Sequence, residues 1–352
     1  MHKHRNKPKK VIIVTDVWGN INGVVTSIIE AKKGLERKNL KVKIVHPKLF
    51  SNLPLPTNSE IKLAIMTGSK LKEIFKKTKP DFIHIATEGP LGLAARIFCT
   101  KNKLKFTTSY HTKLPEYIAI RMKIGVMEPM IWKYLEWFHE TSEKVMVSTE
   151  SLKKELEKHK IKKGVIVPLG IDLKLFKKNK KTPALPKLHT PIFTFLGRVS
   201  PEKNVEAFLK LNLPGTKLII GDGPSKKALE KKFTKNTIFV GYKKGQDIVD
   251  LLSISNVFVF PSKTDTFGLV LLESLACGLP IAAYNVQGPK DIIENGKTGY
   301  IGSNLKKNAL KCLTIDKRNC RKEAEKYSWD TFTKAFIKNL VPAQPSEEKT
   351  SS

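Results

Sequence analysis

The chain has 352 residues, 40% of them hydrophobic, a length that suits about two domains of ordinary size. It contains no run of eighteen or more apolar residues, which excludes a membrane-spanning helix, and no apolar signal-peptide core follows the basic start MHKHRNKPKK. We therefore expect a cytoplasmic protein whose residues 1–9 form a disordered basic tail.

The formal net charge of +32 leaves three hypotheses open. Composition bias ranks first, because nearly all the basic residues are lysines spread along the chain. Peripheral contact with the inner face of an anionic membrane ranks second, since each lysine near such a surface contributes about 1 kcal/mol. Nucleic-acid binding is not expected, because arginine, whose fork of donors suits phosphate, is rare here.

The four cysteines are scattered without the spacing of a metal site, so no metal is predicted. We expect free thiols, as is usual in the cytosol. Cys312 and Cys320 are near enough in sequence to form a disulfide as the alternative, whereas Cys99 and Cys277 have no such neighbour.

Apolar strands alternate with helical patterns from residue 10 to residue 176, which predicts a first α/β domain with a parallel sheet. A loop, Asp16–Gly23, leads from the first strand into a helix at about Val24–Lys38, and a loop rich in Pro and Asn is expected at 47–59. The expected strands are Val11–Thr15, Lys41–Val45, Lys62–Met66, Phe82–Ala86, Phe106–Thr108, Lys144–Val147 and Val165–Val167.

Three residues of this domain lie after predicted strands, at the carboxyl edge where open α/β sheets bind ligands. Gly23 opens a helix, so its amide and those of Val24 and Val25 can approach a phosphate, although a glycine there is also ordinary turn chemistry. Glu88 is expected in the first turn of the next helix, where a carboxylate is stabilising by itself. His111 follows the strand Phe106–Thr108, a position equally compatible with a structural histidine.

The polar run 177–189 is typical of a linker. A second alternation over residues 190–328 predicts a second doubly wound domain, followed by a helix within 329–341 and a disordered tail at 342–352. The expected strands of the second domain are Ile192–Leu196, Lys217–Ile220, Ile238–Val240, Val257–Phe260 and Ile281–Ala283.

Two loops of the second domain carry candidate ligand groups. The motif GRVSPEKN follows the strand Ile192–Leu196 and places Arg198 and Lys203 five positions apart, so the two cations can clamp a pyrophosphate and stabilise the charge of a leaving diphosphate. The alternative is a solvated pair of surface charges. In GDGP, which begins at Gly221, the glycines more naturally permit a tight turn than contact a ligand.

The stretch 261–280, PSKTDTFGLVLLESLACGLP, carries the strongest signal. It follows an apolar strand, and Gly268–Cys277 predicts a helix that is apolar nearly all round and therefore buried. Glu273 is the one charge of that helix and needs a partner, while Asp265 lies in the loop that enters it. The amides around Phe267–Leu269 can receive an anion. These groups indicate a ligand with hydroxyls at both ends and a phosphate between them, such as a sugar nucleotide.

The segment Thr264–Pro289, TDTFGLVLLESLACGLPIAAYNVQGP, resembles the signature of the retaining glycosyltransferases of family 4, which have the GT-B fold. That family typically shows two glutamates with seven residues between them, and Asp265 and Glu273 stand at these positions. The Asp variant is most similar to the branch of bacterial mannosyltransferases and plant sulfoquinovosyl-diacylglycerol synthases. The resemblance extends over roughly Val11–Leu340.

The resemblance implies an α/β protein of two doubly wound Rossmann-like domains that face each other across a cleft, with the acceptor side on the first domain and the nucleotide sugar on the second. It also implies that the last helix crosses back to the first domain. It assigns the diphosphate to Arg198 and Lys203, the hydroxyls of the donor sugar to Asp265, and the ribose hydroxyls to Glu273. By the same resemblance the remaining donor-side groups are Gly23, Tyr242 near the base, and the amides of Phe267, Gly268 and Leu269.

The catalytic group implied by the resemblance comprises His111, Arg198, Lys203 and Asp265. The family's working mechanism reacts on one face of the sugar, with the leaving phosphate taking the acceptor proton, and GT-B enzymes generally need no bound metal. Glu88 is then a candidate on the acceptor side.

These observations favour a retaining glycosyltransferase that moves a hexose from a nucleotide-diphosphate sugar to an acceptor, for which a lipid or glycolipid at the membrane surface is attractive. The alternatives are a catalytically silent protein that binds sugar nucleotides or membranes, and a GT-B sugar-nucleotide epimerase. The donor sugar, the base and the acceptor stay open.

Overall fold

The computed structural model describes residues 8–19, 22–55, 58–115, 128–181 and 183–344. The predicted tails 1–9 and 342–352 fall mostly outside these ranges. Contacts divide the described chain into two compact units. The first comprises 8–115 and 128–168 together with 330–344, and the second comprises 169–329. Within the described part, no helix combines the length and the apolar character that crossing a bilayer requires.

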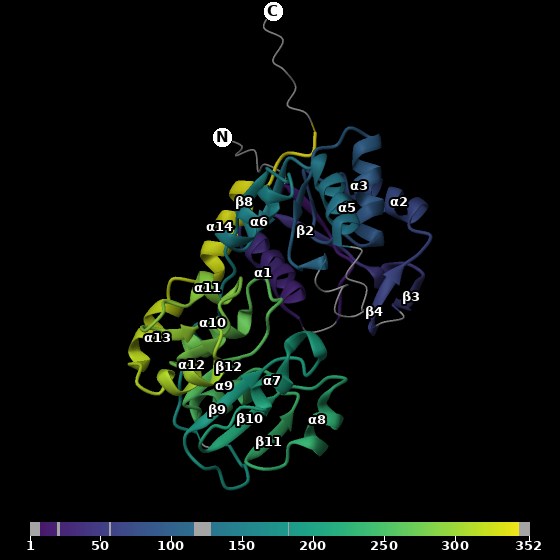
Figure 1. Ribbon diagram of the computed structural model, residues 1–352. Coiled ribbons are helices and arrows are strands. Elements are labelled where there is room, and N and C mark those ends of the chain that lie inside the picture. Colours follow the sequence, from purple (N-terminus) through teal and green to yellow (C-terminus); the bar gives the residue numbers. More distant parts are fainter. Residues whose placement is uncertain (1–7, 20–21, 56–57, 116–127, 182, 345–352) are drawn as a thin grey trace, which may run out of the picture. The chain divides into compact units, whose positions relative to one another are not determined.

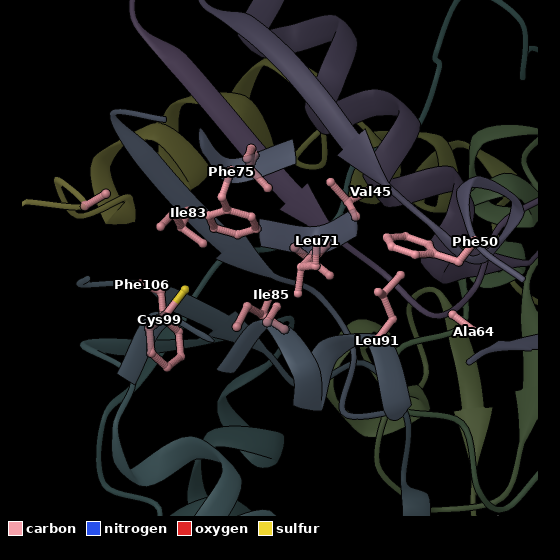
Figure 2. Packing of buried hydrophobic residues seen from close by; sticks show 14 of the residues in the cluster. Val45, Phe50, Ala64, Leu71, Phe75, Ile83, Ile85, Leu91, Cys99 and Phe106 are labelled. Carbon is pink, nitrogen blue, oxygen red and sulfur yellow. The ribbon is translucent and has the colours of Figure 1, made fainter. Parts of the chain in front are cut away.

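The first unit is built on a six-stranded parallel sheet with the order β2-β1-β5-β6-β7-β8. Figure 1 labels β2 and β8 of this sheet and several of the helices of the unit, among them α1, α3 and α5. Its buried cluster includes Phe75, Ile83 and Leu91, which Figure 2 shows in close-up. The strands are β1 (Lys10–Val14), β2 (Lys41–Val45), β5 (Phe82–Ile85), β6 (Thr107–Ser109), β7 (Lys144–Val147) and β8 (Gly164–Ile166). The helices are α1 (Gly23–Arg37), α2 (Gly68–Thr78), α3 (Pro90–Lys101), α5 (Glu128–Glu140), α6 (Glu150–Lys158) and α14 (Trp329–Asn339), with a short 3-10 turn η1 (Pro47–Leu49).

The second unit repeats the architecture with the strand order β11-β10-β9-β12-β13-β14. Its central strands are buried along their whole length and apolar except for Thr194, as expected of strands covered by helices on both faces. The strands are β9 (Ile192–Leu196), β10 (Thr216–Ile220), β11 (Thr237–Gly241), β12 (Val257–Phe260), β13 (Ile281–Ala283) and β14 (Gly299–Ile301). The helices are α7 (Val205–Leu209), α8 (Lys226–Lys232), α9 (Gln246–Ser253), α10 (Leu269–Ala276), α11 (Pro289–Ile292), α12 (Leu305–Cys312) and α13 (Lys317–Ala324), with a 3-10 turn η3 (Pro201–Lys203).

Each sheet reverses its strand order once. In the first unit the reversal lies between β1 and β5, and in the second it lies between β9 and β12. Ligands of open α/β sheets bind at the carboxyl ends of the strands at such a reversal, because the two following loops diverge and leave a crevice. The topology therefore identifies one candidate position in each unit.

One predicted strand of the first domain was wrong. The segment expected as the sheet strand Lys62–Met66 instead forms β4 (Asn58–Ala64), which pairs antiparallel with β3 (Asn52–Leu55) in a separate hairpin. The physical reason is that only one face of the segment is covered, with Ala64 3% exposed and the adjacent Ile65 37% exposed, whereas a strand of the parallel sheet is covered on both faces. The loop predicted at 47–59 is correspondingly interrupted by β3.

Two predicted boundaries also differ. The tail expected from residue 342 is ordered at its start, because Ala343 is buried in the first unit and its amide donates to the carbonyl of Asp81 at 2.8 Å. Residues 169–176, predicted as the end of the first domain, group with the second unit. There Ile171 forms a β-bridge with Ser328, and the carbonyl of Phe176 accepts from Arg321 at 2.6 Å.

The four cysteines are free thiols and all are buried, as predicted over the disulfide alternative. Burial raises the pKa of each thiol to about 12, so none is a thiolate near neutral pH.

Helix α14 packs on α1 through a glycine. A Cβ atom added at Gly34 would lie 2.1 Å from Oγ1 and 2.9 Å from Cβ of Thr333, so rotation of the threonine cannot clear it. We expect Gly34→Ala to lower the free energy of unfolding by about 1–3 kcal/mol, because the steric clash outweighs the roughly 1 kcal/mol that alanine adds to helix stability. Gly68→Ala, at a helix start with nothing within 4 Å, is the matched control in urea denaturation. Equal stabilities of the two variants would contradict the close contact.

Candidate functional site

The loops after β9 and β12 meet at the strand-order reversal of the second unit. The side chain of Asn204 donates to the carbonyl of Pro261 at 3.0 Å, and the carbonyl of Glu202 accepts from the hydroxyls of Ser262 and Thr264, each at 3.4 Å. These bonds hold the GRVSPEKN loop against the loop that enters α10. The structure therefore brings the two strongest motifs of the sequence together.

An ion pair joins these two loops. Nζ of Lys203 contacts Oδ1 of Asp265, and the side chains are only 27% and 18% exposed, so the pair is partly dehydrated but open to a ligand. Oδ2 of Asp265 is buried and makes no hydrogen bond with any residue that the structure describes. An unpaired buried oxygen costs free energy, so this carboxylate is suited to accept a hydroxyl of a ligand.

The backbone of the GDGP loop packs against the loop that carries Arg198. The amide of Val199 donates to the carbonyl of Asp222 at 2.8 Å, and a Cβ atom at Gly221 would lie 1.9 Å from the carbonyl oxygen of Gly197. Gly221 also has φ +141°, a conformation that side chains disfavour. The glycines thus permit backbone packing against the GRVSPEKN loop, in agreement with the structural role predicted for them.

The start of α10 is left open by its own side chains. Gly268 is the N-cap residue with φ +83°, and no side chain of the described residues caps the first turn of this helix. The side chain of Phe267 is 3% exposed and packs edge-on against Tyr327, with 6.2 Å between ring centroids. Phe267 can therefore offer a ligand only its backbone, as can Gly268, beside the first helical residue Leu269. Free amides at a helix start are suited to an anion.

Glu273 lies one turn further along α10 and is partly buried, and its helix neighbours Leu272, Ser274 and Leu275 are buried. Burial raises its pKa to about 7. No side-chain hydrogen bond to Glu273 is formed within the described ranges. Since hydrogen bonds from hydroxyl groups favour the charged form, a ligand that donates them would lower this pKa.

Tyr242 is not brought to the reversal. It follows β11, which is separated from β9 by β10, and its side chain is 50% exposed. It lies at the same carboxyl edge of the sheet, two strands away from β9.

In the first unit His111 follows β6, which ends at Ser109, one residue later than predicted. Burial lowers its pKa to about 4, and the nearby His84 has its pKa lowered to about 3 by burial and then by the charge of His111. His84 is bonded on both ring nitrogens, to Thr107 at 2.9 Å and Ser109 at 3.0 Å. Both rings are therefore neutral at pH 7, so His111 presents an uncharged imidazole.

At the helix start of Gly23, one of the backbone amides is already hydrogen-bonded. The N-cap side chain of Asn22 accepts from the amide of Val25 at 2.9 Å, so Val25 is not available to a phosphate in this state. The prediction for that amide was wrong because a local side chain satisfies it first. Residues 20–21 of the preceding loop lie outside the described residues.

Glu88 lies before its helix, not in the first turn as predicted, because Gly89 is the N-cap of α3. Its carboxylate lies 3.5 Å from Nε2 of His139, whose Nδ1 lies 2.9 Å from Oγ1 of Thr108. Glu88 is thus part of a buried polar chain beneath the sheet edge.

Asp16 was missed by the sequence reasoning. Its carboxylate accepts from the amides of Leu91 at 2.7 Å and Gly92 at 3.1 Å and from Thr87 at 2.8 Å, and burial raises its pKa to about 6. It follows β1, and α3 follows β5, so this carboxylate fills the helix start at the reversal of the first unit. The available signal was a lone aspartate directly after a buried strand.

Two doubly wound units, with a basic loop and an acidic pair at one strand reversal, define a glycosyltransferase of the GT-B class. The profile of Glycosyltransferase Family 4 matches residues 21–175, and that of Glycosyl transferases group 1 matches residues 176–327. The chain belongs to the family 4 glycosyltransferases.

Three relatives are similar over most of the chain. Sulfoquinovosyl transferase SQD2 of Arabidopsis thaliana is 26% identical over 87% of this chain and 64% of its own length, so the chain spans somewhat under two thirds of that relative. A GDP-mannose-dependent alpha-mannosyltransferase of Corynebacterium glutamicum is 24% identical over 84% and 77%. The alpha-monoglucosyldiacylglycerol synthase of Acholeplasma laidlawii is 26% identical over 79% and 81%.

Solved structures agree on the fold. Sucrose-phosphate synthase of Thermosynechococcus elongatus superposes with a TM-score of 0.76 at 18% identity, over 94% of this chain and 98% of that one. The Anabaena protein HepE, solved in complex with UDP-glucose, superposes with a TM-score of 0.69 at 15% identity over the same fractions. The GT-B fold predicted from the sequence is confirmed.

The raised pKa of Glu273 makes stability depend on pH. Because the folded pKa of about 7 exceeds the ordinary value of 4.5, the folded state holds the proton longer, and wild-type stability should fall as pH rises from 4.5 to 7. Glu273→Gln removes this loss. We expect the stability difference between variant and wild type to grow by about 1–3 kcal/mol across that window and then level off. Urea titrations at several pH values measure it.

The control is Glu230→Gln, which changes an exposed carboxylate on α8 of the same unit. Parallel stability curves for Glu273→Gln and wild type would refute the buried, proton-retaining state of Glu273.

Proposed function

We propose that the protein transfers a hexose, with retention of configuration, from a nucleotide-diphosphate sugar to a lipid or glycolipid acceptor. The observation that carries the donor side of the proposal is the Lys203–Asp265 pair at the strand reversal, with one buried carboxylate oxygen unsatisfied beside an uncapped helix start. A cation, a hydroxyl acceptor and free amides in one place are the groups that a sugar diphosphate requires.

The proposed donor arrangement follows from the bonding capacity of each group. Lys203 has three N–H donors, so it can keep Asp265 and still donate to the diphosphate beside Arg198. Asp265 accepts hydroxyls of the sugar through Oδ2, and Glu273 accepts the ribose hydroxyls. The amides at the start of α10 face the phosphate end. In this proposal the cations and the helix start carry the diphosphate charge without a metal ion.

In the proposed reaction the bond between the anomeric carbon and the diphosphate oxygen breaks, and a bond from that carbon to the acceptor oxygen forms on the same face. The acceptor proton passes to the leaving phosphate oxygen. Charge develops on the diphosphate as it leaves, where Lys203 and Arg198 stabilise it more strongly than in the ground state. The neutral His111 is assigned to the side of the transferred sugar, where an uncharged ring can donate or accept one hydrogen bond.

The acceptor class rests on the relatives and on charge. Two relatives are named as a sulfoquinovosyl transferase and a monoglucosyldiacylglycerol synthase, and the latter name specifies a glycolipid product. The net charge of +32 is compatible with peripheral contact of the protein with anionic lipid. The mannosyltransferase relatives use GDP-mannose by name, whereas the HepE structure holds UDP-glucose, so the base is the first quantity to measure. Neither alternative, a silent binder nor an epimerase, is favoured by these relatives.

A thermal-shift panel of UDP, GDP, ADP and their sugar conjugates tests the donor site, because a ligand that binds only the folded state raises the melting temperature. We expect one nucleotide family to stabilise the wild type. Glu273→Ala should weaken binding of both nucleotide and conjugate by about 10-fold or more, since it removes a charged acceptor. Asp265→Asn should abolish only the advantage of the conjugate over the free diphosphate.

Glu230→Ala, on the exposed surface of α8, is the matched control and should behave as wild type. A well-folded wild type that responds to none of these ligands would overturn the proposed function. Retained conjugate preference in Asp265→Asn would overturn the role of that carboxylate while leaving the rest intact.

A further inference from the structure

The β3–β4 hairpin of the first unit carries apolar side chains on the face that points away from the buried core. The register pairs Asn52 with Ala64 and Leu53 with Leu63, and side chains alternate along each strand. Ala64 points inward and belongs to the buried cluster that includes Phe50 and Leu91 (Figure 2). The opposite face therefore holds Leu53 and Leu63.

The same outer face continues past β4. The amide of Ile65 donates to the carbonyl of Ser51 at 2.8 Å, which extends the ladder and places Ile65 two residues beyond Leu63 on the same side. Leu53 is 56% exposed, Ile65 is 37% exposed and the adjoining Met66 is 87% exposed. Three of the ten exposed large apolar residues of the described chain thus lie on this one hairpin and its exit. We call this set, Leu53, Leu63, Ile65 and Met66, the outer hairpin face.

Met66 is also held in a strained backbone conformation. Its φ is +52°, a region that a bulky side chain rarely adopts. Strain of this kind persists where it serves a use, and here no packing compensates it because the side chain projects into solvent. An exposed, strained methionine next to exposed leucine and isoleucine is a surface prepared for contact.

The chemistry of the face indicates its occupant. Its four side chains are hydrocarbon or thioether, and Ser51, opposite Ile65 in the ladder, adds one hydroxyl among the described residues of this face. The face therefore suits a uniform apolar phase better than a patterned protein surface. Between Ser51 and Lys79 the sequence has six lysines and two glutamates, and Lys62, Lys70 and Lys72 are exposed. An exposed apolar face within a segment of net positive charge complements the boundary of an anionic bilayer.

The location of the hairpin is consistent with delivery of a lipid acceptor. β2 ends at Val45, and the next residue, His46, stacks on Trp18 of the loop after β1 with 4.9 Å between ring centroids. The hairpin follows directly, so it lies at the same carboxyl edge of the sheet as His111 and the loop before Gly23. We propose that the outer hairpin face inserts into the surface of an anionic membrane and holds this edge against it. The role of this contact in delivering an acceptor rests on the proposed function, whereas membrane binding itself can be measured independently of it.

The test is sedimentation of the full chain with vesicles of phosphatidylcholine containing phosphatidylglycerol. We expect wild type to bind them. The double variant Leu53→Ser, Met66→Ser should bind at least about tenfold more weakly, since lipid anchoring scales with inserted apolar surface. The matched control is Leu310→Ser, Leu313→Ser, which removes two exposed apolar residues at the end of α12 in the second unit. The control should bind as wild type.

A second variant separates folding from docking. Met66→Gly relieves the positive φ, so its melting temperature should be equal to or above that of wild type while vesicle binding falls. Unchanged vesicle binding in the hairpin variants, or equal release of every variant by salt alone, would overturn the proposal in favour of diffuse lysine adsorption. A change of oligomeric state in the hairpin variants without vesicles would overturn it in favour of a second copy of the chain.

These outcomes are independent of the donor site. Thermal shifts with nucleotide sugars in the absence of vesicles should be the same for wild type and hairpin variants. Failure of all donors to bind would refute the proposed function and leave the vesicle result standing, whereas failure to bind vesicles would refute only the docking surface.

Discussion

The single reversal of strand order in each sheet is the constraint on which the candidate site depends. Loops that leave neighbouring strands in opposite directions diverge, which leaves a crevice that side chains from two motifs far apart in sequence can face. In the second unit this places Lys203 beside Asp265, sixty-two residues later, with Asn204 and Glu202 fastening the backbones. The ion pair is a consequence of the topology, and its partial exposure keeps both partners accessible to a ligand.

The two units use equivalent positions differently. In the first unit the helix start at the reversal, that of α3, is filled by Asp16, which accepts two of its amides. In the second unit the corresponding helix start, that of α10, has Gly268 as N-cap and no side-chain cap. An anion from outside would have to displace a buried carboxylate in the first unit, whereas none of the described side chains caps α10 in this way. This asymmetry agrees with the proposed donor side on the second unit and leaves the first unit for an uncharged group such as an acceptor hydroxyl.

The sequence predicted the features that depend on pattern and missed those that depend on packing. The buried helix around Glu273 and the strands before Gly197 and Asp265 follow from apolar periodicity and glycine placement, and the structure reproduces them within one residue. The cap by Asp16 could not be foreseen, because its amide partners are about seventy-five residues away. The hairpin was mistaken for a sheet strand because a short apolar run does not reveal whether one face or two are covered. Ala343 looked like tail because only the tertiary structure supplies its neighbours.

The imperfectly satisfied groups of the second unit explain why a ligand with particular chemistry is favoured. Glu273 retains its proton to a pKa of about 7 because burial penalises its charge, and Oδ2 of Asp265 is buried without a donor. Both carboxylates would be stabilised by hydroxyl groups, which supply donors without adding charge, whereas a second cation would serve only the charge. Between them the start of α10 and the cations Lys203 and Arg198 favour negative charge. The second unit therefore presents groups that favour a hydroxyl, an anion and a hydroxyl in that order, and a molecule with the same order of groups would stabilise all three.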